Sequence, residues 1–218
     1  MRNRFDRQLE QLHVELMEMG SMCEEVIRKT SRVLETGEKE MAKDIRKEDA
    51  RIDEQERLLI ESLCLKLLLQ QQPVAKDLRK VSAALKMITD MERIGDQASD
   101  IAEIVETGKL VASQQQTKLA QMAETTINMV TGSVDAYVKQ DLELVKEVIA
   151  MDDKVDELFL EVRDEIAGLL KSDAVAQLDC MDMLMIAKYY ERIGDHATNI
   201  AEWVEFSITG MHKDVDVL

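Results

Sequence analysis

Proline and aromatic residues are scarce in this sequence of 218 residues. It contains a single proline, and phenylalanine, tyrosine and tryptophan together make up 3% of it. Strands are enriched in aromatic and β-branched residues, whereas proline interrupts helices in their interior. Because 45% of the residues are hydrophobic and 33% are charged, we expect an all-α protein built from long amphipathic helices.

Paired cysteines and long apolar runs are missing as well. The three cysteines, Cys23, Cys64 and Cys180, are odd in number and show no Cys-x-x-Cys spacing, so we expect buried, reduced thiols. No stretch approaches the roughly 18 apolar residues of a membrane span, and residues 1–7 lack the apolar core of a signal peptide. We therefore expect a cytoplasmic protein that meets a membrane only through partner proteins.

Positive charge is in deficit, because 44 acidic residues face 28 lysines and arginines and leave a net charge of −16. The second half, residues 111–218, alone holds 21 acids against 9 basic residues. Such a surface repels phosphate backbones, which argues against a nucleic-acid partner. It favours cations and basic protein surfaces instead.

Apolar residues recur with a helical period along most of the chain. The predicted helices span about 5–35, 38–69, 75–107, 118–139, 142–170 and 175–208. Gly37 is expected to end the first helix and Pro73 to follow the break after the second, while residues 109–117 read as the connection between two halves. Helices of about 30 residues are some 45 Å long, so with short turns each set of three should pack antiparallel.

A ten-residue stretch occurs twice, 99 residues apart, as Glu92-Arg-Ile-Gly-Asp-Gln-Ala-Ser-Asp-Ile101 and Glu191-Arg-Ile-Gly-Asp-His-Ala-Thr-Asn-Ile200. Repetition at this spacing indicates internal duplication. We predict two tandem, structurally repeated antiparallel three-helix bundles, residues 1–110 and 111–218. Glycine inside a helix costs about 1 kcal/mol relative to alanine, so Gly95 and Gly194 are interpreted as points where a neighbouring helix approaches closely.

The repeated stretch places acidic side chains four residues apart, hence on one face of a helix. A second set of acid pairs follows the same spacing in the second helix of each half. The candidate metal ligands are Asp49, Asp53, Glu92, Asp96 and Asp100 in the first half, and Asp152, Asp156, Glu191, Asp195 and Asn199 in the second. Carboxylates from two antiparallel helices suit divalent or iron cations, either Mg²⁺, Ca²⁺, Mn²⁺, Fe or Zn²⁺. The alternative is a solvated acidic face, in which Asp96 pairs with Arg93.

Three segments resemble the PhoU family of phosphate-uptake regulators. They are Gln72-Pro-Val-Ala-Lys-Asp-Leu-Arg79, Glu92-Arg-Ile-Gly-Asp96, and Tyr190-Glu-Arg-Ile-Gly-Asp-His-Ala-Thr-Asn-Ile-Ala-Glu202. The resemblance implies two three-helix bundles whose acid-x-x-x-Asp motifs hold, in some members, multinuclear clusters of iron or other metals. It implies a cytoplasmic negative regulator that connects a phosphate ABC transporter, through its ATPase subunit, with a sensor histidine kinase. The two copies differ at two of these positions: Asp100 corresponds to Asn199, and Gln97 corresponds to His196. These differences leave open whether both sites bind metal with equal charge or nuclearity.

Two other kinds of protein compete with this interpretation. A di-iron carboxylate enzyme would need Glu-x-x-His pairs on two helices, and only Glu10-Gln-Leu-His13 has that spacing. The cysteines have no histidine placed to activate them, so we expect no enzyme. The other competitor is a helical scaffold without metal. The sequence leaves open whether the protein forms a homodimer.

Overall fold

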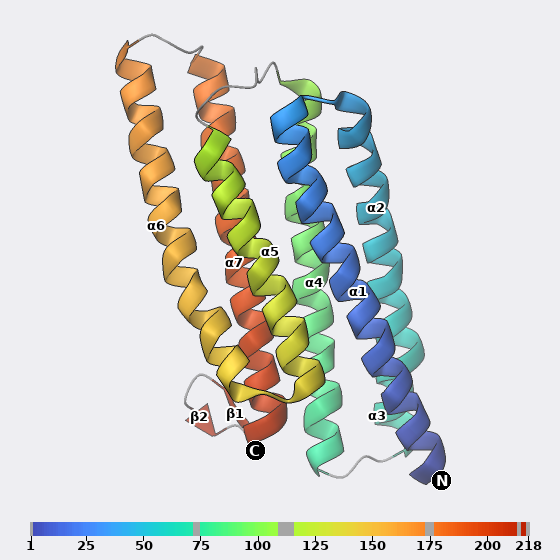
Figure 1. The fold of residues 1–218 in the computed structure, drawn as a ribbon. Coiled ribbons are helices and arrows are strands. Elements are labelled where there is room, and N and C mark those ends of the chain that lie inside the picture. The colour runs from blue at the N-terminus through green and yellow to red at the C-terminus, as the bar shows by residue number, and fades with distance from the viewer. Residues whose placement is uncertain (1, 72–74, 109–115, 173–176, 213–214, 217–218) are drawn as a thin grey trace.

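The computed structural model describes residues 2–71, 75–108, 116–172, 177–212 and 215–216 (Figure 1). The first half contains α1 (Arg2–Thr36), α2 (Lys39–Leu58), the π-helical turn η1 (Leu59–Cys64), α3 (Leu65–Gln71) and α4 (Ala75–Thr107). The second half contains α5 (Gln116–Lys139), α6 (Leu142–Ser172) and α7 (Gln177–Thr209), followed by β1 (Met211–His212) and β2 (Val215–Asp216). These elements confirm the predicted all-α class and its duplicated three-helix plan.

Two features depart from the prediction. The second predicted helix is not uniform, because η1 interrupts it with a wider turn between α2 and α3. A two-stranded antiparallel hairpin, β1 with β2, follows α7, and it is too small to alter the fold class. The predicted boundary between residues 110 and 111, and much of the two predicted breaks near 73 and 173, lie outside the described residues.

The first turn of each half contains a residue with positive φ. Gly37 adopts φ 67° and its amide donates to the Val33 carbonyl at 2.8 Å, which ends α1. In the second half, Gln140 lies 103 residues later and takes a similar φ of 53°. Asp141 then starts α6, because its Oδ1 accepts the Glu143 amide at 2.9 Å. The duplication is therefore visible in the turns as well as in the helices.

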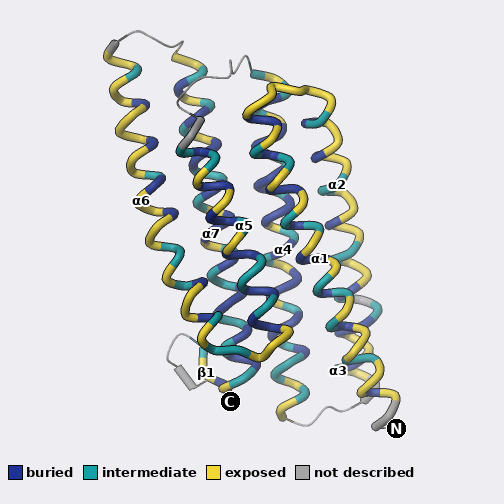
Figure 2. The backbone as a smooth tube through the Cα atoms, viewed as in Figure 1, coloured by how far each residue is buried: buried dark blue, intermediate teal, exposed yellow. Residues whose placement is uncertain are grey.

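The helices α4 and α7 lie side by side and run in opposite directions through the middle of the molecule (Figure 1). Buried residues cover more of their circumference than on the outer helices, whose exposed stripes face solvent (Figure 2). The buried apolar residues of both halves form one continuous cluster. Inside it, the hydroxyls of Thr30 and Tyr190 form a buried hydrogen bond of 2.8 Å between the halves. The two bundles thus share a core.

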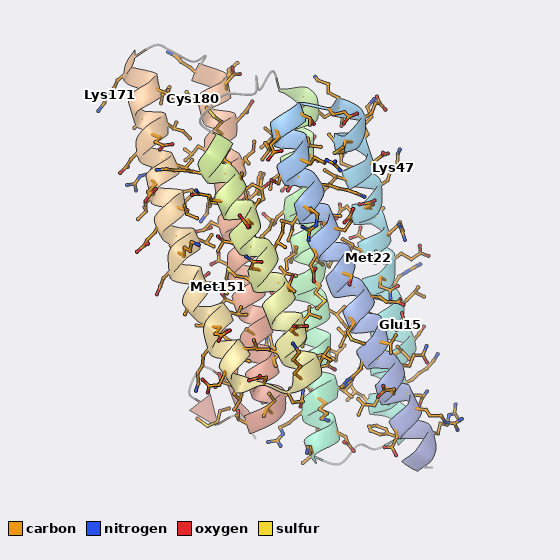
Figure 3. All side chains as sticks on the ribbon, in the orientation of Figure 1. Glu15, Met22, Lys47, Met151, Lys171 and Cys180 are labelled. Carbon is orange, nitrogen blue, oxygen red and sulfur yellow. The ribbon has the colours of Figure 1, made fainter. Side chains whose placement is uncertain are left out.

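The surface is charged along its whole length, and side chains such as Lys47 on α2 and Lys171 on α6 project from the outer helices (Figure 3). The three cysteines are buried and unpaired, as the sequence predicted. No described helix has both the length and the apolar character that a membrane span requires.

Candidate metal centre

Three of the predicted ligands meet where α2 packs on α4. Asp49 and Asp53 occupy successive turns of α2, and Asp96 faces them from α4. One carboxylate oxygen from each lies within 4.8 Å of the other two. Two oxygens on opposite sides of an ion bound at about 2.1–2.4 Å are separated by about 4.2–4.8 Å. The group therefore has the dimensions of a cation site.

The glycine of the repeated motif makes this approach possible. A Cβ atom on Gly95 would lie 2.9 Å from Asp49 Oδ1 and 3.1 Å from Ile52 Cδ1. Both distances are shorter than ordinary contacts, so a side chain at this position would displace the Asp49 carboxylate. The predicted close helix approach is present here, and what approaches most closely is a candidate ligand.

Burial and mutual repulsion make the first-half site electrostatically unfavourable. Burial, followed by the charges of Asp53, Asp96 and Asp100, raises the pKa of Asp49 to about 6, while a hydrogen bond from Ser99 acts in the opposite direction. The Asp49 carboxyl group is thus harder to ionise because it is buried and because its neighbours carry negative charge.

Glu92, on the same helix, is affected similarly. Burial, and then Asp96, raise the pKa of Glu92 to about 7, although Arg93 opposes the change. Arg93 is the predicted pairing partner of Asp96, and its Nη1 does lie 2.8 Å from Asp96 Oδ2. The guanidinium side chain is 54% exposed, so this pair contributes little stability.

One atom in this site is without a partner. Asp49 Oδ1 is buried and accepts no hydrogen bond from any residue that the structure describes. A buried acceptor left unpaired costs about 1–3 kcal/mol, and more when it is charged. An oxygen in this condition, beside two further carboxylates, suits a hard cation such as Mg²⁺ or Mn²⁺. The residues present therefore fit a metal.

The remaining first-half candidates lie at the edge of this group. Glu92 pairs with Arg93, with 3.4 Å between Glu92 Oε2 and Arg93 Nε. Asp100 faces α7, where a hydrogen bond with Tyr189 opposes the rise in its pKa that burial causes. Neither belongs to the group within 4.8 Å. The structure thus brings together three of the five predicted ligands of this half.

The second half places its acids on α6 and α7 in a more open arrangement. Burial, together with Asp195 and Asp156, raises the pKa of Asp152, and burial followed by Glu191 raises that of Asp195. A cavity of about 630 Å³ adjoins Asp152 and Asp195. Within the described chain, no second-half acids form a group as close as the one in the first half.

The glycine of the second copy is also less crowded. A Cβ on Gly194 would lie 3.5 Å from Val155 Cγ1 and 3.6 Å from Asp152 Oδ1, which are ordinary contacts. The two copies of the motif therefore leave different amounts of room between the glycine and the side chains of the neighbouring helix.

Between the two sites, α4 and α7 contact each other through a polar seam that the sequence did not predict. Asp90 Oδ1 lies 2.9 Å from His196 Nδ1 and accepts the Asn199 side-chain amide at 3.3 Å. Tyr189, the residue 99 positions after Asp90, contacts Asp100, the counterpart of Asn199. The side-chain amide of Asn199, a predicted ligand, is thus hydrogen-bonded to Asp90 on α4. Aligning the two copies shows which residues are equivalent but not that α4 faces α7, so the sequence alone held no signal for this pairing.

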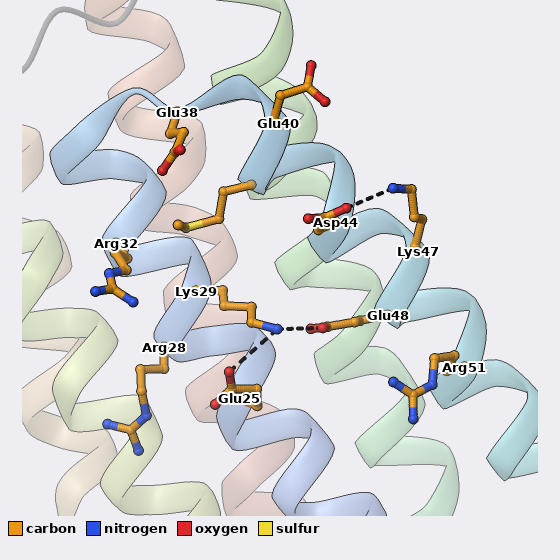
Figure 4. A pocket seen from close by; sticks show the side chains of 11 residues that line it. Glu25, Arg28, Lys29, Arg32, Glu38, Glu40, Asp44, Lys47, Glu48 and Arg51 are labelled. Atoms are coloured by element: carbon orange, nitrogen blue, oxygen red, sulfur yellow. Dashed lines mark hydrogen bonds and ion pairs between the residues drawn. The ribbon is translucent and has the colours of Figure 1, made fainter.

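A separate groove of about 490 Å³ runs between α1 and α2 (Figure 4). Lys29 contacts Glu48 and also lies 3.4 Å from Glu25, and Lys47 lies 2.7 Å from Asp44. Five acidic and five basic residues line the groove. Its charges largely compensate one another, so it does not have the excess of one sign that a cation or anion site needs.

The fold defines a class of protein: duplicated, all-helical proteins built from two three-helix bundles. In this chain, carboxylates lie between the second and third helices of each half. The family model described as the PhoU domain matches this chain twice, over residues 16–105 and 119–204. The chain belongs to the PhoU family.

Relatives and solved structures agree with this assignment. A phosphate-specific transport system accessory protein PhoU homolog of Clostridium acetobutylicum is 36% identical over 217 residues, covering 97% of each chain. The crystal structure of PhoU from Pseudomonas aeruginosa superposes with a TM-score of 0.87 at 28% identity, covering 95% of this chain and 100% of that one. The crystal structure of the phosphate transport system regulatory protein PhoU from Streptococcus pneumoniae superposes with a TM-score of 0.88 at 26% identity. The match covers 97% of this chain and 100% of that one.

Proposed function

We propose that this protein is a cytoplasmic negative regulator of phosphate uptake and of phosphate-starvation signalling. It acts as an adaptor between the ATPase subunit of a phosphate ABC transporter and a sensor histidine kinase. Membership of the PhoU family supports this proposal, as do the names of its relatives, which are described as accessory or regulatory proteins of phosphate transport. An adaptor needs surfaces rather than a reaction centre, so we propose no catalytic step.

We further propose that the adaptor binds metal through its two carboxylate clusters. In the first half Asp49, Asp53 and Asp96 would hold the ion, with Glu92 and Asp100 at the edge. In the second half Asp152, Asp156 and Asp195 would do so, with Glu191 at the edge. Bound metal supplies positive charge that neutralises repelling carboxylates. The observation that carries the proposal is Asp49 Oδ1, a buried oxygen without a hydrogen bond beside two other acids.

The position of the first cluster suggests what the metal does for the adaptor. Asp49 and Asp53 belong to α2, an outer helix, whereas Asp96 belongs to α4 in the shared core. An ion held by all three would fasten an outer helix to the core. A surface presented by α1 and α2 would then be more rigid with metal than without it.

Metal analysis tests the site. We expect purified protein to retain iron, manganese, magnesium or zinc, and the double variant Asp96→Asn, Asp195→Asn to lose most of it with unchanged helical circular dichroism. A variant with two acids replaced away from the clusters, Glu10→Gln with Asp164→Asn, is the control. Equal metal content in all three proteins would leave a helical scaffold without a specific metal site.

A signalling assay tests the role. In a host whose own PhoU gene is deleted, a phosphate-starvation reporter should stay on at high phosphate and be switched off when this chain is expressed. A reporter that this chain leaves on, although the protein accumulates in folded form, would argue against a regulator. Comparison with the double variant then shows whether regulation requires the metal site.

A further inference from the structure

The second-half site already contains a cation that belongs to the chain. The ammonium group of Lys188 contacts both carboxylate oxygens of Glu191. Glu191 is 15% exposed, so this pair is shielded from water on the carboxylate side. Phe159 on α6 lies against the same ammonium, with 5.5 Å from Nζ to the ring centroid. Lys188 is therefore held over the acids of this half from two helices.

Among the described residues, the first-half site has no such lysine. The residue 99 positions before Lys188 is Thr89, which carries no charge. The nearby cation is Arg93, whose side chain is 54% exposed and lies 2.8 Å from Asp96 Oδ2 and 3.4 Å from Glu92 Oε2. Its contact with Glu92 is longer than the contacts of Lys188 with Glu191. In the second half, neither oxygen of Glu191 is free.

We propose that Lys188 is a built-in counter-ion that weakens metal binding in the second half, so that the two sites fill in order. The inference rests on the metal binding proposed above. A divalent ion that uses Glu191 must first displace the ammonium group, and an ion that binds beside it meets a positive charge. The first-half site therefore fills at low metal concentration and the second-half site at higher concentration. Two unequal sites let one adaptor respond to metal over two concentration ranges.

The test replaces Lys188 by the residue of the first copy. Protein stripped with chelator is titrated with Mn²⁺ alone by calorimetry, for the parent and for Lys188→Thr. We expect two classes of site in the parent. The tighter class is the one lost in Asp96→Asn, and the weaker class is the one lost in Asp195→Asn. Lys188→Thr should tighten the weaker class about tenfold or more and leave the tighter class unchanged, because a charge next to the ligands is removed.

The control is Lys146→Thr, which removes a lysine of the same charge from an exposed pair with Glu143 on α6. A tightening equal to that of Lys188→Thr would assign the effect to net charge and overturn the proposal. Two equal classes in the parent would also overturn it while leaving the proposed metal sites intact. The absence of any Mn²⁺ binding by the parent would refute both.

A second variant does not depend on Lys188→Thr folding well. Lys188→Met removes the ammonium charge but keeps an unbranched side chain of similar length against Phe159, so Mn²⁺ affinity in the second half should rise as it does in Lys188→Thr. Unchanged second-half affinity in a folded Lys188→Met protein would contradict the role of Lys188.

Discussion

The two motif glycines offer a matched experiment, because the same substitution meets different surroundings in the two copies. In Gly95→Ala the new methyl carbon would lie 2.9 Å from Asp49 Oδ1 and 3.1 Å from Ile52 Cδ1. In Gly194→Ala the nearest atom, Val155 Cγ1, would be 3.5 Å away. Both residues lie well inside their helices, so the change in helix propensity is the same.

The expected stabilities differ because crowding opposes propensity in one copy only. Alanine is better than glycine inside a helix by about 1 kcal/mol, and Gly194→Ala should gain about that amount. Gly95→Ala should gain the same helix-propensity stabilisation but lose about 1–3 kcal/mol to overpacking. We expect a loss near the lower end of this range, because the atoms that must move are the tips of side chains. The free energy of unfolding should therefore differ between the two variants by about 1–3 kcal/mol.

Metal should widen this difference. An ion at a hundred times its dissociation constant raises the free energy of unfolding by about 2.7 kcal/mol, and by about 1.4 kcal/mol if its affinity falls tenfold. Because Gly95→Ala displaces Asp49, we expect it to lose part of the Mn²⁺ stabilisation that Gly194→Ala keeps. Urea unfolding of the parent and both variants, in chelator and in Mn²⁺, measures these quantities. If the two alanine variants are equally stable and respond equally to Mn²⁺, the proposed contact between Gly95 and a metal ligand is wrong.

Two further predictions concern protonation and the shared core. The raised pKa values of Asp49 and Glu92 mean that the folded chain holds more protons than the unfolded chain between about pH 4 and pH 7, so metal-free stability should fall as pH rises through this range. Urea unfolding at pH 5 and pH 7 checks this, and Asp49→Asn should flatten the dependence. Tyr190→Phe removes the buried hydrogen bond to Thr30 and should lower the free energy of unfolding by about 0.5–1.5 kcal/mol. Tyr137→Phe removes a buried hydroxyl that has no hydrogen-bond partner among the described residues, so stability should stay unchanged or rise. Equal costs for the two would contradict the role of the bond between the halves.

Helix positions could be predicted from the sequence because hydrophobic period and helix breakers act locally. The predicted helix 75–107 coincides with α4, and the others begin or end within a few residues of the observed bounds. The turn η1 could not be predicted, since a π-turn depends on how Leu59 and Leu63 both reach the core. The packing of α4 against α7 could not be predicted from the sequence either. An amphipathic pattern shows that one face of a helix is buried, but it does not show which helix covers that face.

The candidate site divides in the same way. Spacing of four residues identified the acid pairs, and duplication favoured a metal site over an ordinary charged face as their interpretation. Spacing does not show how far a side chain reaches across to the next helix. Spacing therefore could not show that Asp96 lies beside Asp49 whereas Asp100 contacts Tyr189. It also could not show that the Lys188 ammonium group contacts the Glu191 carboxylate.

The outer helices show how far the two halves have diverged around a common core. In the first half Lys29 on α1 bridges to Glu48 on α2, and a groove lies beside them. The residue 103 positions after Lys29 is Gly132, where a Cβ would lie 2.8 Å from Val148 Cγ2, so α5 and α6 pack directly together. Two long, ion-paired side chains thus lie between one pair of outer helices, whereas a glycine lies between the other pair. The third helices, in contrast, keep the repeated acidic motif. This combination suits the adaptor proposed above, because shared central helices would hold two related sites while unlike outer faces would allow each half to contact a different protein.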